Sequence, residues 1–219
     1  MTTFPNSPRL IKGGIVLINP ETSAVERVIA LQYNPETLSR TLQVQGAGSE
    51  GGDRSLALRL KGPPIETIKL DAEIDATDQL EFPDRHADAT QLGIHPQLAA
   101  LEMLIYPSSD RLLENNRLAK SGTLEILPAE TPLSLFIWSK SRILPVRVTD
   151  FSVTEEAFDP SLNPIRAKIS LGMRVLNVND LGFSHAGGSL YIAYHQLKER
   201  LAAKSLSAAI NALGIGGIQ

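Results

Sequence analysis

The sequence has no cysteine and few aromatic residues. Its 219 residues include no Cys and four His, and Phe, Trp and Tyr make up only 5%. The absence of Cys excludes disulfides, thiolate nucleophiles and cysteine-based metal or redox sites. A small-molecule-binding β-barrel needs an interior lined by aromatic side chains, so the composition disfavours that class of protein.

Long apolar runs and an excess of positive charge are also missing. The opening MTTFPNSPRL has no apolar core for a signal peptide, and no later run is long enough to span a membrane. The formal net charge is −3 and the pI is about 5.8, which argues against nucleic acid as a partner. We expect a soluble protein that is synthesised in the cytoplasm.

Motifs of catalysis are not found either. The sequence contains no GxSxG, HExxH or Walker pattern. Asp84, His86 and Asp88 have a spacing that could suit a metal ion, but a solvated polar loop is the simpler interpretation. We predict that the chain is not an enzyme and has no catalytic, cofactor or metal site.

What the sequence does contain is alternation of apolar and polar residues. Period two is clearest in residues 65–74 and 165–178, and a hairpin is expected over residues 10–33. Further strands are expected at residues 37–44, 55–60, 122–127, 133–138 and 143–153. Helical spacing is confined to residues 94–105 and 189–213, and residues 75–89 are predicted to be a polar loop.

These elements predict a mainly β fold with accessory helices (α+β). We expect an antiparallel β-barrel or sandwich over residues 1–180, with one inserted helix. Residues 181–219 are predicted to be a linker and a C-terminal helical extension.

Charge is distributed unevenly along the chain. Residues 71–88 hold seven acids and one Arg, for a net charge of −6, whereas residues 165–219 hold six bases and two acids, for +4. Two solvated faces are one interpretation, and head-to-tail contact between subunits is the other. The predicted inter-subunit residues are Asp71, Glu73, Asp75, Asp78, Glu81, Arg166, Lys168 and Arg174.

The predicted tail helix has an apolar stripe that needs a partner. The stripe is formed by Leu190, Ala193, Leu197 and Leu201. It docks either on its own domain or on another subunit, and both interpretations stay open from the sequence.

Four blocks of sequence resemble a known family. They are YNPETLSR (33–40), KGPPIETIKLDAEIDATD (61–78), GIHPQLAALEMLIYP (93–107) and LPVRVTDFSVTEEAFDPSLNPIRAKISLGMRVL (144–176). They are similar to the tube and baseplate proteins of contractile injection systems, which are phage-tail-like particles. Within that family the chain most resembles the tube-initiator adaptor between inner tube and spike. That adaptor normally carries a LysM module, and no LysM pattern is found in this sequence.

The resemblance implies a structural role with no cofactor. It implies a tail-tube-like fold and a homohexameric ring around a channel, whose partners would be the spike or hub protein, the inner-tube protein and baseplate wedge proteins. The protein would be incorporated into an injection particle. Alternatives are the main inner-tube protein of the same particle and, from another class, a small-molecule-binding β-barrel.

The resemblance also assigns two surfaces. A glycine-rich loop is the candidate for stacking on the next ring, and its residues are Gly46, Gly48, Glu50, Gly51, Gly52 and Asp53. The polar side of the closing strands is the candidate channel lining, with Arg166, Lys168, Ser170 and Arg174. A register slip of one residue would exchange the two faces of these strands.

Overall fold

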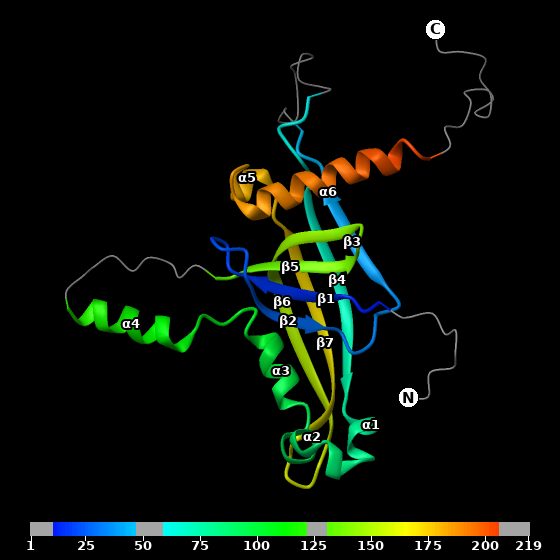
Figure 1. Ribbon diagram of the computed structural model, residues 1–219, viewed down its shortest axis with the longest axis vertical. Helices are drawn as coiled ribbons and strands as arrows, with labels where there is room; N and C mark the ends of the chain where they lie inside the picture. The colour runs from blue at the N-terminus through cyan, green and yellow to red at the C-terminus, as the bar shows by residue number, and fades with distance from the viewer. Residues whose placement is uncertain (1–10, 47–58, 122–130, 206–219) are drawn as a thin grey trace.

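Alternating sequences form one antiparallel sheet in the computed structural model, which describes residues 11–46, 59–121 and 131–205. The sheet has seven strands in the order β2-β1-β5-β6-β7-β4-β3 (Figure 1). Their bounds are β1 Gly14–Ile18, β2 Val25–Ala30, β3 Leu38–Gln43, β4 Ile65–Asp75, β5 Leu133–Ser139, β6 Arg142–Phe158 and β7 Pro164–Val175. The predicted mainly β fold with accessory helices is confirmed.

The predicted hairpin and the two long alternating strands are confirmed. β1 pairs with β2 across a short turn, and β7 lies between β4 and β6 in antiparallel register. The strand expected at residues 122–127 lies outside the described residues. Only the end of the one expected at 55–60 is described, where Leu60 forms an isolated bridge with Gly46.

The sheet curls but does not close into a barrel. Just beyond edge strand β2, the side-chain amide of Gln32 donates to the Asp75 carbonyl oxygen at 2.7 Å and accepts from the Asp75 amide nitrogen at 3.0 Å. The Gln32 side chain thus connects the segment after β2 to the end of β4, two parts of the sheet that would pair directly through their backbones in a closed barrel. Edge strands β2 and β3 each pair on one side only.

The region between β4 and β5 holds more helices than predicted. They are α1 Thr77–Leu80, the 3₁₀ turn η1 Pro83–Arg85, α2 Ala87–Leu92, α3 His95–Glu102 and α4 Ser109–Lys120. The expectations of a polar loop at 75–89 and of one inserted helix were therefore wrong. The short helices have too few turns to show apolar periodicity, and α4 is largely polar. Hydrophobic periodicity in the sequence therefore identifies neither the short helices nor α4.

Gly93 joins α2 to α3 beside the β6–β7 turn. Its φ is +58°, and a Cβ there would lie 2.2 Å from the Pro164 carbonyl oxygen. The next amide, of Ile94, donates to that same oxygen at 2.9 Å. Only glycine allows this approach, which fastens the helices to the end of the long strands.

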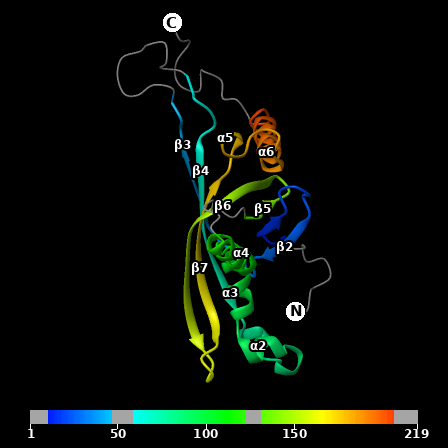
Figure 2. The ribbon, with the colours of Figure 1, turned by 90° about the vertical axis from the view of Figure 1, so that its left-hand side faces the viewer.

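Helices and short strands cover one face of the long strands only. In Figure 2, β3, β4, β6 and β7 form a thin blade, and β2, β5, α3 and α6 Ala186–Ala202 lie to one side of it. The largest fully buried side chains lie between these layers and include Phe136, Ile68, Ile169, Leu171 and Met173. No helix within the described residues is long and apolar enough to cross a membrane.

Candidate functional site

The other face of the blade is bare and polar. The register puts the outward side chains of β3, β4, β7 and β6 in rows across the sheet. They are Ser39, Thr41, Thr67, Lys69, Asp71, Glu73, Asp75, Arg166, Lys168, Ser170, Arg174, Asp150, Ser152, Thr154 and Glu156, with Gly172 among them. We call this set the bare face. The set itself contains no apolar side chain, so water can wet it, whereas Ile65 at the start of β4 is an apolar residue on the same side of the sheet.

Ion pairs within the chain organise the bare face. The Arg166 Nε donates to the Asp75 Oδ2 at 2.8 Å, and the Lys168 Nζ donates to the Glu156 Oε1 at 2.9 Å. These contacts raise the pKa of Arg166 and of Lys168. Burial alone would raise the pKa of Asp75, but hydrogen bonds from Thr77 and Arg166 outweigh it and hold that pKa below its ordinary value.

Some of the predicted inter-subunit acids and bases meet within one chain. Asp75 is opposite Arg166 in the register, and Glu73 is opposite Lys168. Arg174 is paired with Asp180, at 2.7 Å. Antiparallel β4 and β7 explain this, because segments far apart in sequence become neighbours in the sheet. Contact of these residues with another subunit stays a prediction.

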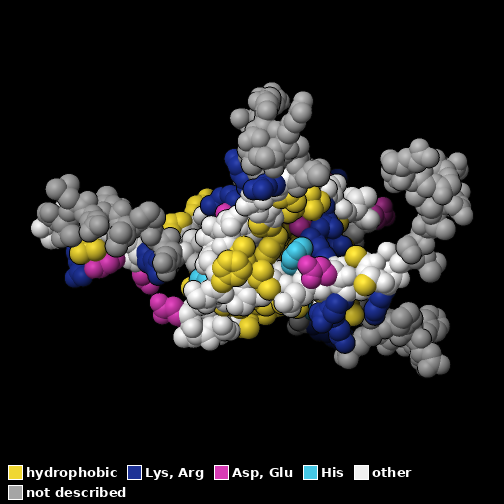
Figure 3. All heavy atoms as spheres, turned by 90° about the horizontal axis from the view of Figure 1, so that it is seen from above, with side chains coloured by type: hydrophobic (Ala, Val, Ile, Leu, Met, Phe, Trp, Pro, Cys, Tyr) yellow, Lys and Arg dark blue, Asp and Glu magenta, His cyan; other side chains and the backbone are white. Residues whose placement is uncertain are grey.

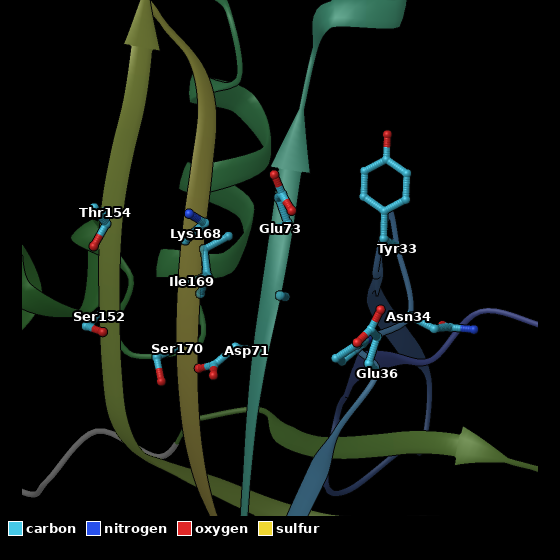
Figure 4. Close-up of a pocket in the computed structure, with 12 residues that line it drawn as sticks. Tyr33, Asn34, Glu36, Asp71, Glu73, Ser152, Thr154, Lys168, Ile169 and Ser170 are labelled. Atoms are coloured by element: carbon cyan, nitrogen blue, oxygen red, sulfur yellow. The ribbon is translucent and has the colours of Figure 1, made fainter.

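A shallow groove of about 550 Å³, lined mainly by polar residues, runs along the middle of the bare face (Figure 4). Asp71 and Glu73 point into it from β4, Lys168 from β7, and Tyr33 and Glu36 border it from the β2–β3 loop. In the part of the chain that the structure describes, no three His, Asp or Glu side chains are arranged to hold a metal ion. The groove presents hydrogen-bonding groups and charged side chains to any molecule that binds there.

A buried ion cluster, which the sequence did not suggest, holds α6 on the sheet. The Glu66 side chain is 3% exposed and lies between Arg40 of β3, at 2.6 Å, and Lys198 of α6, at 3.3 Å. The Arg40 Nη2 also donates to the Tyr194 hydroxyl at 3.4 Å, and the Lys198 Nζ lies 4.3 Å from the centre of the Tyr194 ring. One carboxylate thus fastens an edge strand and the helix together.

α6 docks by a face next to the predicted stripe. Its buried residues are Gly187, Gly188, Tyr191 and Tyr194, and both tyrosines belong to the main core. Burial, with smaller effects of Glu66 and Tyr194, raises the pKa of Tyr191. The buried tyrosines lie outside the predicted stripe, which consists of leucine and alanine.

The predicted stripe itself is only partly covered. Leu190 packs against the small cluster around Leu133 and Leu197 is half-buried, but Ala193 and Leu201 are exposed. The helix begins at Ala186, where His185 is the N-cap and its Nδ1 accepts from the Gly187 amide. The sequence predicted helical spacing from residue 189 onward, so the helix begins three residues earlier than expected. Whether the exposed part of the stripe contacts another subunit stays a prediction.

Of the predicted stacking loop, only Gly46 is described. It pairs with Leu60 and marks where the loop leaves the sheet. Gly48, Glu50, Gly51, Gly52 and Asp53 lie outside the described residues. Of the candidate metal ligands, Asp84 is in η1, His86 is between η1 and α2, and Asp88 is in α2; all three are exposed.

The two ends of the long axis carry opposite charge. At the end that is lower in Figure 1, residues 76–93 and 155–164 hold seven acids and one base, Arg85, for a net charge of −6. At the upper end, residues 40–46, 59–66 and 186–205 hold six bases and two acids, a net charge of +4. In the view from above, Lys and Arg side chains gather beside α6 (Figure 3).

Each end also exposes large apolar side chains. At the lower end they are Phe82, Leu92, Phe158 and Leu162, and at the upper end Leu42, Val44, Leu60 and Leu201. Apolar groups within a charged rim are typical of protein contact surfaces. Both ends of the molecule therefore have the chemistry of docking surfaces.

Comparison with known proteins gives remote structural matches. No family model matches the chain, and no curated protein does. Three solved structures contain chains that are similar to this one and 12% identical to it. In the C6-symmetric tail of an empty gene transfer agent (GTA) particle, the match has a TM-score of 0.28 and covers 75% of this chain and 90% of that one. In the virion of a native GTA particle the TM-score is 0.24, with 74% of this chain and 90% of that one covered, and in the six-fold symmetrised baseplate of the anti-feeding prophage it is 0.25, with 78% and 94% covered. TM-scores this low do not establish a shared fold.

Proposed function

We propose that the chain is a structural component of a phage-tail-like injection particle. Copies would form a ring, a homohexamer by the family resemblance, with the bare face turned toward a central channel. The observation that carries this proposal is the bare face itself, which is polar across four strands and uncovered by any described helix. An antiparallel sheet with one buried and one solvated face is suited to line a water-filled passage.

Within such a particle the role that fits best is an adaptor between the spike or hub and the inner tube. An adaptor must present different surfaces to two different neighbours. The acidic lower end and the basic upper end differ in this way, and the outer helices are left for baseplate wedge proteins. The role involves no catalytic step and no cofactor.

The main inner-tube protein of the same particle is the second candidate. Opposite charges at the two ends also suit copies stacked on one another. A small-molecule-binding barrel fits less well, because the sheet is open and the groove on its bare face is polar and shallow.

Electron microscopy of the particle, with this chain located in the density, is the decisive experiment. One six-fold ring between spike and tube is expected, and rings repeated along the shaft would assign the chain to the tube. Absence of the chain from any ring-shaped assembly would overturn the proposal.

Charge reversal tests the role of the lower end. Asp78→Lys with Glu81→Lys should weaken incorporation into particles more strongly at low salt than at high salt, because salt screens exposed charges. Lys12→Glu, a change at an exposed residue in neither end segment, is the control. Equal incorporation of the reversed variant at low salt would show that the acidic end is not a docking surface.

A further inference from the structure

One segment of the chain exposes an unusual number of large apolar side chains. Of the nineteen exposed large hydrophobic residues in the described part of the chain, six lie between residues 103 and 118. They are Met103, Ile105, Tyr106, Leu112, Leu113 and Leu118. This segment comprises the linker after α3 and most of α4, and we call it the arm.

Local interactions build α4 well. The Ser108 Oγ accepts from the Arg111 amide as an N-cap, Asp110 lies in the first turn, and Arg117 and Lys120 lie in the last turn. These features suit the helix dipole and the free amides of the first turn. The sequence thus specifies a helix here in spite of its polar composition.

Tertiary contacts do not support this helix. None of its residues is buried, and it has no extensive packing against another described helix or strand. Leu112 and Leu113 are 54% and 65% exposed. A helix of twelve residues is marginal in water without packing, so α4 needs a surface to cover its leucines.

The direction of the arm suggests where that surface lies. In Figure 1, α4 extends sideways from the body, away from the long axis. In Figure 2, with the blade seen edge-on, α4 is viewed nearly end-on. If the bare face lines a channel, the arm points around the ring toward the next copy.

An apolar groove lies between the open edge of β2 and helix α3. It is lined by Val28, Ile29, Leu31, Ile74, Ala100 and Leu101, among others. Val28, at its rim, is 65% exposed. β2 is an edge strand, so the groove is accessible from outside the molecule.

Charges of the arm and the groove are complementary. The C-terminal half of α4 has Arg117 and Lys120 and no acid, whereas no basic residue is among the described residues that line the groove. Glu26 of β2 and Glu102 of α3 are on the elements that form its walls. A basic helix end therefore suits this groove better than an acidic one would.

We propose that the arm of one copy docks in the β2–α3 groove of a second copy. The contact joins two different surfaces, and repetition of such a contact closes a ring of identical subunits when the rotation from copy to copy returns to the first one. This inference rests on the proposed ring, and it names the elements that hold neighbouring copies together. Leu112 and Leu113 occupy the groove, and the Arg117 and Lys120 end lies beside its acids.

The chain has no cysteine, so any disulfide between copies must join the cysteines that are introduced. A Leu113→Cys variant of the full chain is mixed with a Val28→Cys variant and oxidised, and mixed dimers are counted on a non-reducing gel. Val44→Cys is the matched control, since Val44 is 69% exposed near the opposite edge of the sheet. We expect at least about ten times more mixed dimer with Val28→Cys than with Val44→Cys, as for a tenfold preference in equilibrium.

Equal yields with the two partners would overturn the inference. So would a disulfide within the monomer of the double variant Leu113→Cys/Val28→Cys, since the arm would then cover its own groove. Six-fold rings by electron microscopy together with equal yields would leave the proposed function standing without the arm contact. Specific mixed dimers from a chain absent from any ring would leave the arm contact without the proposed function.

A second variant tests the leucines without cysteine chemistry. Leu112→Gln/Leu113→Gln keeps good helix formers at exposed positions, so thermal unfolding of the monomer should shift by only about 2 °C or less. Association measured by sedimentation should fall at least about tenfold. Unchanged association would contradict the proposal.

Discussion

The two faces of the long strands differ in nearly every respect. On the covered face, Ile68, Ile169 and Met173 are at most 1% exposed, and close packing there supplies stability. On the bare face the neighbouring residues are polar and paired by hydrogen bonds and ion pairs. The difference indicates that one face holds the protein together while the other is available for contact with water.

The largest effect on stability is expected from removing a side chain that packs on the covered face. Ile169→Ala removes a fully buried side chain and should lower the free energy of unfolding by about 3 to 4 kcal/mol. Ser170→Ala, one residue away on the bare face, should change it by about 0.5 kcal/mol or less. Urea denaturation of both variants measures the contrast, and similar losses would show that both faces contribute to packing.

The next largest effect is expected at the Glu66 cluster. Glu66→Gln leaves Arg40 and Lys198 without their shared carboxylate and should cost about 2 kcal/mol, less than a fully buried pair because both cations are partly exposed. Hydrogen exchange should rise first in α6. Glu36→Gln, a matching change at an exposed residue beside the bare face, is the control, and a protected α6 in Glu66→Gln would argue against the cluster as its anchor.

A smaller, pH-dependent effect is expected on the bare face. The pKa of Asp75 is lowered in the folded chain, so its ionised form stabilises the fold above the ordinary pKa of 3.8, and this contribution is lost as pH falls through the lower folded pKa. Asp75→Asn should therefore be less stable than wild type at pH 6 by up to about 1 kcal/mol.

The gap between Asp75→Asn and wild type should narrow as pH falls below 4. Chemical denaturation between pH 2 and pH 6 measures this, with Ser170→Ala as a nontitrating control that should run parallel to wild type. A gap that does not depend on pH would mean that Asp75 acts by its shape rather than by its charge.

The least effect is expected from Lys168→Gln. Its ion pair with Glu156 is exposed, and such pairs contribute little, so unfolding should shift by about 0.5 kcal/mol or less. The substitution should instead change the binding of any molecule that contacts the bare face. A loss of stability comparable to that of Ile169→Ala would remove the distinction between the two faces.

Much of the fold could be predicted because it depends on local pattern. The period of two in β4 and β7 correctly predicted which side chains face the core, since burial of one face fixes the register. The helices between β4 and β5 could not be predicted in the same way. α1 and α2 are too short, and α4 lacks an apolar stripe against the body, so apolar periodicity does not distinguish these three helices from loop.

The sequence by itself determined the alternating strands, the N-cap of α4 and the absence of cysteine chemistry, because each depends on residue type and spacing alone. Only the tertiary structure decided that Asp75 meets Arg166, that Glu66 meets Lys198, and that charge is separated along the long axis. The pairs join residues 91 and 132 positions apart in the chain, and the pairing of strands and the docking of α6 bring them together. Spacing along a chain does not carry that information.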